Sequence, residues 1–207
     1  MSGNRGERQG TDPLAARTLN VLLAGIGGQG VLTASQLLAE AGVRAGYDVK
    51  KSEVHGMAQR GGSVTSHVRF APRVYSPLIE EGTADFLVAF EELEALRYLH
   101  FLSPKGRVLT DTLQVKPMPV LIGAAQYPGD VIDRVKAGAW KVYVVEAFKK
   151  AKELGETRAQ NIVMLGALSR LLSIPESVFE DVIRQSVKAK FVDLNLRAFQ
   201  AGRKLLK

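Results

Sequence analysis

The chain has 207 residues, of which 46% are hydrophobic and 24% charged, a balance typical of a soluble globular domain with a substantial core. It contains no cysteine, which excludes disulfide bonds, thiolate catalysis and cysteine-ligated iron–sulfur clusters within the chain. The formal net charge is +7, and residues 184–207 hold seven Lys and Arg residues against one Asp. Such a charge suits nucleic acid, an anionic cofactor or an acidic partner subunit, and equally a solvated helix face.

The N-terminal stretch, residues 1–18, is predicted to be a disordered leader. It is polar and lacks the apolar core of a signal peptide. No apolar run along the chain approaches the roughly 20 residues that cross a bilayer. The sequence therefore predicts a cytoplasmic protein without a membrane span.

A glycine-rich loop follows the first predicted strand, residues 19–24. The loop reads Gly25-Ile26-Gly27-Gly28-Gln29-Gly30, and apolar residues at helical spacing begin at Val31. Glycines let a backbone approach a ligand closely, and the free N–H groups of a helix start bind phosphate. The loop is therefore a candidate anion site, with Gly25, Gly27, Gly28, Gln29 and Gly30 as its ligands. The alternative is that the glycines only permit tight packing of strand against helix.

Two lysines come after this helix, which we expect to end near Gly46. A short second strand is predicted at residues 47–49, followed by Lys50 and Lys51. In dinucleotide-binding folds an acidic residue about 20 positions after the loop binds the ribose, and Asp48 has that place. The adjacent lysines favour phosphate over a free ribose, which argues against NAD and leaves NADP or another phosphorylated ligand open. Lys50 and Lys51 are thus candidate phosphate ligands.

A second glycine-bearing segment, residues 52–62, concentrates polar side chains. Arg60 before Gly61 and Gly62 offers a bidentate fork beside exposed backbone N–H groups, and Ser52 adds a hydroxyl. His55 is a candidate acid/base, although a structural role in the loop is the competing interpretation. The three histidines lack metal-ligand spacing, so no metal site is predicted. No nucleophile motif or P-loop is present, so a partner must complete any catalytic set.

The remaining elements alternate between strands and helices. Strands are predicted at 63–70, 84–90, 107–111 and 141–145, and helices at 91–101, 158–172, 175–187 and 191–206, whereas 112–139 is left unassigned. This order predicts an α/β fold with a mostly parallel, Rossmann-like sheet flanked by helices and a helical C-terminal extension. We assign residues 19–190 to the α/β domain and 191–207 to a basic C-terminal helix. Leu194, Ala198, Ala201 and Leu205 form its predicted apolar stripe.

Several of these motifs carry a resemblance to a known family. The stretches Gly25-Ile26-Gly27-Gly28-Gln29-Gly30 and Ser52-Glu53-Val54-His55-Gly56-Met57-Ala58-Gln59-Arg60-Gly61-Gly62-Ser63 resemble the gamma-type subunits or domains of 2-oxoacid:ferredoxin oxidoreductases. The similarity continues at 74–79, 84–97 and 161–168 and covers roughly residues 19–190. Within the family the small subunits of indolepyruvate enzymes are most similar, because pyruvate-type relatives usually carry an aromatic residue at the position of His55.

The resemblance implies a subunit that supports oxidative decarboxylation of a 2-oxoacid to acyl-CoA and CO2, with electrons passing to ferredoxin. It implies a large partner subunit that holds thiamine diphosphate and the iron–sulfur clusters, and coenzyme A as co-substrate. The glycine loop, Lys50, Lys51 and Arg60 then become candidate ligands of the coenzyme A phosphates. Lys190, Arg197 and Lys204 form a basic stripe that could dock on an acidic surface of the partner.

Two other functions remain open from the sequence alone. A self-contained NADP- or flavin-binding reductase would use the same glycine loop and would retain a bound dinucleotide. A nucleic-acid-binding module would use the basic C-terminus, but the aromatic residues that usually interleave such a surface are missing there. The sequence therefore favours an accessory subunit that binds no nucleic acid and is inactive without its partner.

Overall fold

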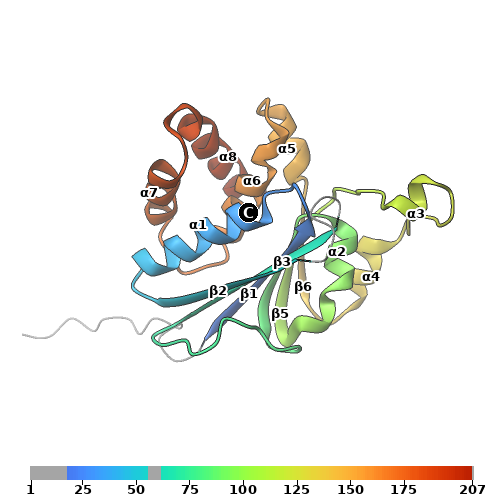
Figure 1. Ribbon diagram of the computed structural model, residues 1–207, viewed down its shortest axis with the longest axis horizontal. Helices are drawn as coiled ribbons and strands as arrows, with labels where there is room; N and C mark the ends of the chain where they lie inside the picture. Colours follow the sequence, from blue (N-terminus) through green and yellow to red (C-terminus); the bar gives the residue numbers. More distant parts are fainter. Residues whose placement is uncertain (1–17, 56–61, 207) are drawn as a thin grey trace, which may run out of the picture.

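The protein is described here by a computed structural model, whose residues 18–55 and 62–206 are placed well enough to discuss (Figure 1). Arg60 and Gly61 lie outside these residues, as does nearly all of the predicted leader and the side chain of His55. The six strands form one sheet in the order β2-β3-β1-β4-β5-β6. Their bounds are β1 Leu19–Ile26, β2 Asp48–His55, β3 Ser63–Ala71, β4 Ala84–Ala89, β5 Leu102–Asp111 and β6 Lys141–Val145.

The sheet is mostly parallel. Strands β1, β4, β5 and β6 pair in parallel, whereas β3 runs antiparallel to both β1 and β2. The middle of β1 shows why a central strand has consecutive apolar residues: Val21 and Leu23 belong to the core on one face, and Leu22 and Ala24 to the core on the other. A strand covered on both faces needs apolar side chains at every position, not at alternate ones.

Helices cover both faces of the sheet. On one face lie α1 (Val31–Arg44), α5 (Ala147–Glu153), α6 (Gln160–Ser169), α7 (Glu176–Ser186) and α8 (Val192–Leu205). On the other face lie α2 (Glu92–Arg97) and α4 (Val131–Ala137) (Figure 1). The predicted α/β class, with a mostly parallel sheet flanked by helices and a C-terminal helix, is confirmed. None of the helices in residues 18–55 and 62–206 is long and apolar enough to cross a membrane.

Several element bounds differ from the sequence prediction. Strand β2 runs on through Lys50 and Lys51 to His55, because its backbone pairs with β3 in full register although its side chains are polar. Strand β5 begins at Leu102, five residues before the predicted start at Arg107, and passes through Gly106. The predicted helix 91–101 is α2 followed by the 3₁₀ turn Leu99–Phe101. The unassigned region contains α3 (Met118–Leu121) and α4, and α5 was not anticipated.

The C-terminal helix α8 packs tightly against α6. The predicted stripe is wrong in part, since the helix buries Ala198, Phe199 and Gly202, whereas Ala201 is only partly buried. Small residues let the two backbones meet: a Cβ on Gly166 would lie 2.1 Å from the Phe199 carbonyl oxygen, and one on Gly202 would lie 1.9 Å from the Val163 carbonyl oxygen. Phe199 therefore shares the main core, while the boundary drawn between residues 190 and 191 stays a prediction.

Candidate functional site

The candidate site lies where β1, β4 and β5 end. After β1 the chain enters α1 on one face of the sheet, and after β4 it enters α2 on the other face. The connections thus diverge between the adjacent strands β1 and β4. In open α/β sheets this divergence leaves a crevice beyond the carboxyl ends of the strands, and ligands bind there.

The glycine loop forms one wall of this crevice, and its backbone requires glycine at two positions. Gly28 has φ 106° and Gly30 has φ 77°, both in the left-handed region that side chains disfavour. Gly30 is the residue before α1, and the first turn of that helix has no acidic side chain. The unpaired N–H groups of the helix start are therefore available to an anion. A Cβ on Gly28 would meet nothing within 4 Å, so the loop is open on that side.

The glycine loop contacts the end of the second glycine-bearing segment, at Gly62. The Gly27 N–H donates to the Gly62 carbonyl at 2.9 Å. His55 pairs with Val64 at the end of β2, and Val64 pairs with Gly25. The structure therefore brings the glycine loop, Gly62 and the main chain of His55 to one edge of the sheet.

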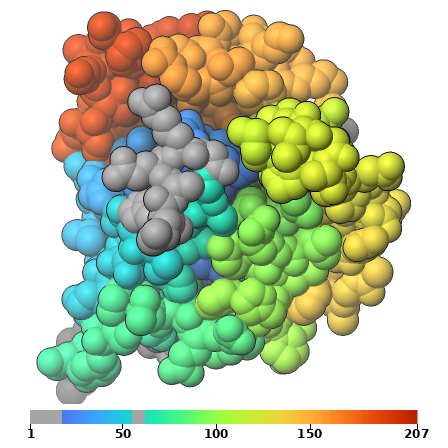
Figure 2. All heavy atoms as spheres, turned by 45° about the vertical axis from the view of Figure 1, so that its right-hand side comes forward, coloured from blue at the N-terminus to red at the C-terminus, as the bar shows by residue number. Residues whose placement is uncertain are grey.

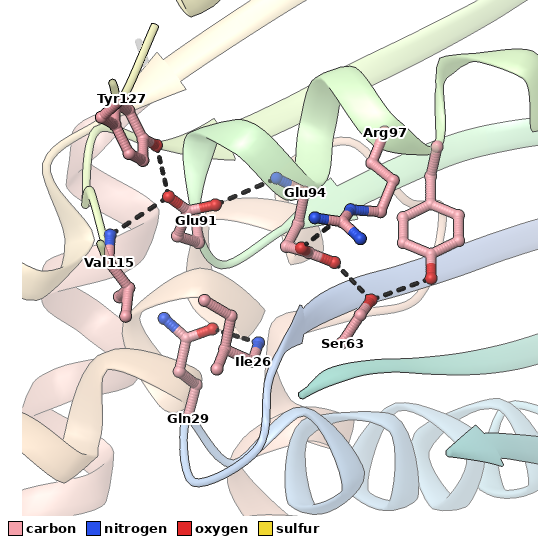
Figure 3. Close-up of polar contacts among 9 residues, drawn as sticks. Ile26, Gln29, Ser63, Glu91, Glu94, Arg97, Val115 and Tyr127 are labelled. Carbon is pink, nitrogen blue, oxygen red and sulfur yellow. Dashed lines mark hydrogen bonds and ion pairs between the residues drawn. The ribbon is translucent and has the colours of Figure 1, made fainter. Parts of the chain in front are cut away.

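The side chain of Gln29, predicted as a ligand, is used inside the loop. Its Oε1 accepts the Ile26 N–H at 2.6 Å (Figure 3). Its Nε2 donates to the Phe90 carbonyl at 3.1 Å. A second amide on α6 supports the same region, since Asn161 Nδ2 donates to the Gly30 carbonyl at 3.3 Å. Gln29 thus shapes the loop with its amide, and its main-chain N–H also bonds within the loop, to the Ile26 carbonyl at 3.1 Å.

Lys50 and Lys51 do not lie beside the glycine loop. Lys50 pairs with Arg69, which pairs with Asn20, five residues before Gly25 on β1. At about 3.4 Å per residue this places Lys50 about 17 Å along the sheet from the loop. The Lys50 ammonium forms an ion pair with Asp48 at 2.7 Å, and the Lys51 ammonium forms one with Glu53 at 2.6 Å. Ser52, the next residue of β2, lies level with Leu22 of β1, three residues before Gly25.

Buried carboxylates on the β4–α2 connection were missed by the sequence analysis. Glu91 is 1% exposed and accepts the Glu94 N–H at 3.0 Å, the Val115 N–H at 3.1 Å and the Tyr127 hydroxyl at 2.5 Å. Glu94 is 3% exposed and accepts the Ser63 hydroxyl at 2.5 Å (Figure 3). The available signal was a run of carboxylates directly after the apolar stretch 86–90, at the edge where parallel strands end.

Burial raises the pKa of two carboxyl groups at this edge of the sheet, Glu94 and Asp111. Loss of hydration is the main cause that raises the pKa of Glu94, and the hydrogen bond from Ser63 and the ion pair with Arg97 offset it only in part. Burial likewise raises the pKa of Asp111 at the end of β5, although Gln160 and two backbone N–H groups of α5 bond its carboxylate. Asp111 thus bonds backbone from a distant segment, whereas Glu94 bonds side chains. No group of acids and histidines in the described residues could hold a metal ion.

A cavity of about 350 Å³ opens beside the first turn of α1. Thr33 and Asn161 line it on the side of the glycine loop, and Val187, Phe191 and Leu194 give it an apolar floor. Arg158 lies at its rim, paired with Glu156 at 2.8 Å. The arrangement combines a glycine loop and the free N–H groups of a helix start with an adjoining cavity that is partly apolar, and this combination suits a ligand that joins phosphate to a less polar arm.

The structure is thus an α/β protein with a glycine loop and a helix start at the carboxyl edge of its mostly parallel sheet. The family model described as pyruvate ferredoxin/flavodoxin oxidoreductase matches residues 20–205. The chain therefore belongs to this family.

Relatives extend this result. The indolepyruvate oxidoreductase subunit IorB of Thermococcus kodakarensis is 43% identical over 195 residues, which cover 91% of this chain and 96% of that protein. The ketoisovalerate oxidoreductase subunit VorA of Methanothermobacter marburgensis is 33% identical over 90% of this chain but only 36% of its own length. The gamma subunit of a keto/oxoacid ferredoxin oxidoreductase from Geobacter sulfurreducens has a TM-score of 0.69 at 25% identity, over 90% of this chain and 97% of that one. The predicted role as a small subunit of a 2-oxoacid:ferredoxin oxidoreductase is confirmed, and a self-contained reductase is not favoured.

Proposed function

We propose that the chain serves an oxidoreductase of the arylpyruvate type, with indolepyruvate as substrate. The observation that carries this proposal is the 43% identity with an indolepyruvate oxidoreductase subunit along nearly the full length of both chains, against 33% with the ketoisovalerate subunit. The reaction would convert the 2-oxoacid and coenzyme A into acyl-CoA and CO2, with electrons passing to ferredoxin. The large partner subunit would hold thiamine diphosphate and the iron–sulfur clusters. The cytoplasmic location stays a prediction.

The substrate assignment is tested on the assembled complex. The chain is co-expressed with the thiamine-binding subunit of its own organism, and ferredoxin reduction is followed with indolepyruvate, phenylpyruvate, pyruvate and 2-oxoglutarate. We expect the highest kcat/KM for the two aryl substrates and none from this chain alone. A complex that prefers pyruvate or 2-oxoglutarate would refute the arylpyruvate assignment.

Within this complex the glycine loop would hold the phosphates of coenzyme A. The helix start after Gly30, the open side of Gly28 and the adjoining cavity support this role. Arg60 stays a candidate ligand on sequence grounds. Lys50 lies about 17 Å along the sheet from the loop, Lys51 lies in the middle of β2, and both are ion-paired, so the proposed site does not include them.

A charge placed in the loop tests the coenzyme A site. Gly28→Asp would put a carboxylate where phosphate binds, and we expect the KM for coenzyme A to rise at least tenfold. Gly46→Asp is the matched control, because Gly46 also has a positive φ, 91°, and open space around its Cβ position. Both variants carry similar backbone strain. Equal KM values for the two variants would place coenzyme A elsewhere.

A further inference from the structure

An uncharged loop protrudes from the carboxyl edge of the sheet. Residues 115–127, which we name the tip loop, contain α3 near their apex, and no residue from Pro117 to Gly129 is charged. Its large apolar side chains face solvent: Met118 is 66% exposed, Leu121 63% and Ile122 70%. Figure 1 shows α3 extending beyond α2 and α4, and Figure 2 shows its yellow-green atoms as a lobe on the surface. Exposed apolar patches of this kind mark interaction sites.

The tip loop is fixed at its base and ordered within. One oxygen of Glu91, Oε1, accepts both the Val115 N–H and the Tyr127 hydroxyl, so the two ends of the loop meet at a single buried carboxylate (Figure 3). Near the apex the Ala124 N–H donates to the Pro119 carbonyl at 2.9 Å, past Gly123 in the left-handed conformation. The apolar side chains are therefore presented by a closed loop of defined shape, which lowers the ordering cost of binding.

We propose that the tip loop docks into an apolar surface of the large, thiamine-binding subunit. This inference rests on the proposed function. If coenzyme A bound at the glycine loop must reach a thiamine-bound intermediate held by another chain, that chain must cover the same edge of the sheet. The tip loop stands at this edge, attached through Glu91 next to Phe90, whose carbonyl bonds Gln29 of the glycine loop.

The chemistry of the tip loop selects an apolar surface over a charged one. A chain with 24% charged residues leaves thirteen consecutive positions uncharged here, although most of them are exposed. Interface cores are depleted in charged residues and enriched in methionine. Lys116 lies at the base of the tip loop, and a nucleic acid or an acidic surface would find no cation to pair with along residues 117–129. In the ketoisovalerate relative the equivalent unit makes up 36% of a longer polypeptide, so a further part of the same chain is present there that could contact this loop.

The test is assembly of the full complex. Leu121→Asp/Ile122→Asp places two carboxylates in the contact, and we expect its affinity for the co-expressed large subunit to fall by about 100-fold or more. Both side chains are mostly exposed, so the melting temperature of the free subunit should not change. Leu78→Asp is the control: Leu78 is 51% exposed but lies at the opposite edge of the sheet, where its carbonyl accepts Arg69. Wild-type affinity for the double variant would overturn the proposal.

A crosslinking measurement keeps the test decisive if the double variant folds poorly. A photoreactive phenylalanine replaces Leu121 in one preparation of the complex and Leu78 in another. We expect a covalent product with the large subunit from position 121 and none from position 78. A product from position 78 alone would overturn the docking surface while leaving the proposed function intact. Failure of the unmodified chain to assemble with any thiamine-binding subunit would overturn both.

Discussion

The close contact between α6 and α8 predicts that a side chain at Gly202 lowers the free energy of unfolding. In Gly202→Ala the new Cβ would start 1.9 Å from the Val163 carbonyl oxygen, whereas ordinary contacts begin at 3.4 Å. The obstacle is backbone and cannot rotate away, so the helices must separate by more than about 1 Å. Overpacking of a core costs about 1–3 kcal/mol, and this overlap belongs at the upper end of that range or above it. Alanine regains about 1 kcal/mol of helix propensity, which leaves a net loss of about 2 kcal/mol or more.

Urea denaturation and calorimetry measure this loss. In a protein of this size 1 kcal/mol shifts the melting temperature by about 2–4 °C, so we expect a decrease of about 4–8 °C. Gly129→Ala is the control, because Gly129 has open space around its Cβ position and no positive φ, and we expect a change within about 1 kcal/mol. A Gly202→Ala variant as stable as the wild type would show that α8 does not sit against α6 as described.

Three further predictions concern the site and pH. Gln29→Met keeps the side chain's size but leaves the Ile26 N–H without its acceptor; the unfolding free energy should fall by about 1–3 kcal/mol, with weaker coenzyme A binding. The pKa of Glu94 is raised in the folded protein, so the unfolding free energy should fall as pH rises from about 4.5, the ordinary pKa of a Glu carboxyl, through the pKa in the folded state. Glu94→Gln should flatten that part of a series of urea denaturations at different pH. Burial lowers the pKa of His67, whose Nδ1 accepts the Ile79 N–H, so stability should fall as pH drops below about 6.5, and an NMR titration that showed an ordinary His67 pKa would contradict this.

The fold was readable from the sequence where local chemistry dictates it. Strand β1 is apolar from Val21 to Ala24 because both of its faces are covered, and the loop after it needs glycine at Gly28 and Gly30 because φ is positive there. These requirements act within a few residues and leave a local pattern. The parallel sheet and the glycine loop were therefore predictable before any tertiary contact was known.

The placement of individual site residues depended on pairing between distant segments. Lys50 was grouped with the glycine loop because the predicted strand ended before it, but the register of β2 against β3 carries it to the other end of the sheet. Glu91 and Asp111 were not recognised because their partners, among them Val115 and Ala147, are backbone groups far along the chain. Gln29 was interpreted as a ligand, although its best partners are carbonyl and N–H groups of its own surroundings.

Two consecutive residues at the end of β4 connect the parts of this site. The Phe90 carbonyl accepts the amides of Gln29, from the glycine loop, and of Gln160, from α6. The carboxylate of the next residue, Glu91, holds both ends of the tip loop. One planar peptide unit joins these two residues, so the glycine loop and the tip loop are attached to adjacent positions of the sheet. In the proposed function the reacting groups are held by two chains, and this shared attachment would keep them in place, because a displacement of about 1 Å between reacting groups is enough to slow a reaction strongly.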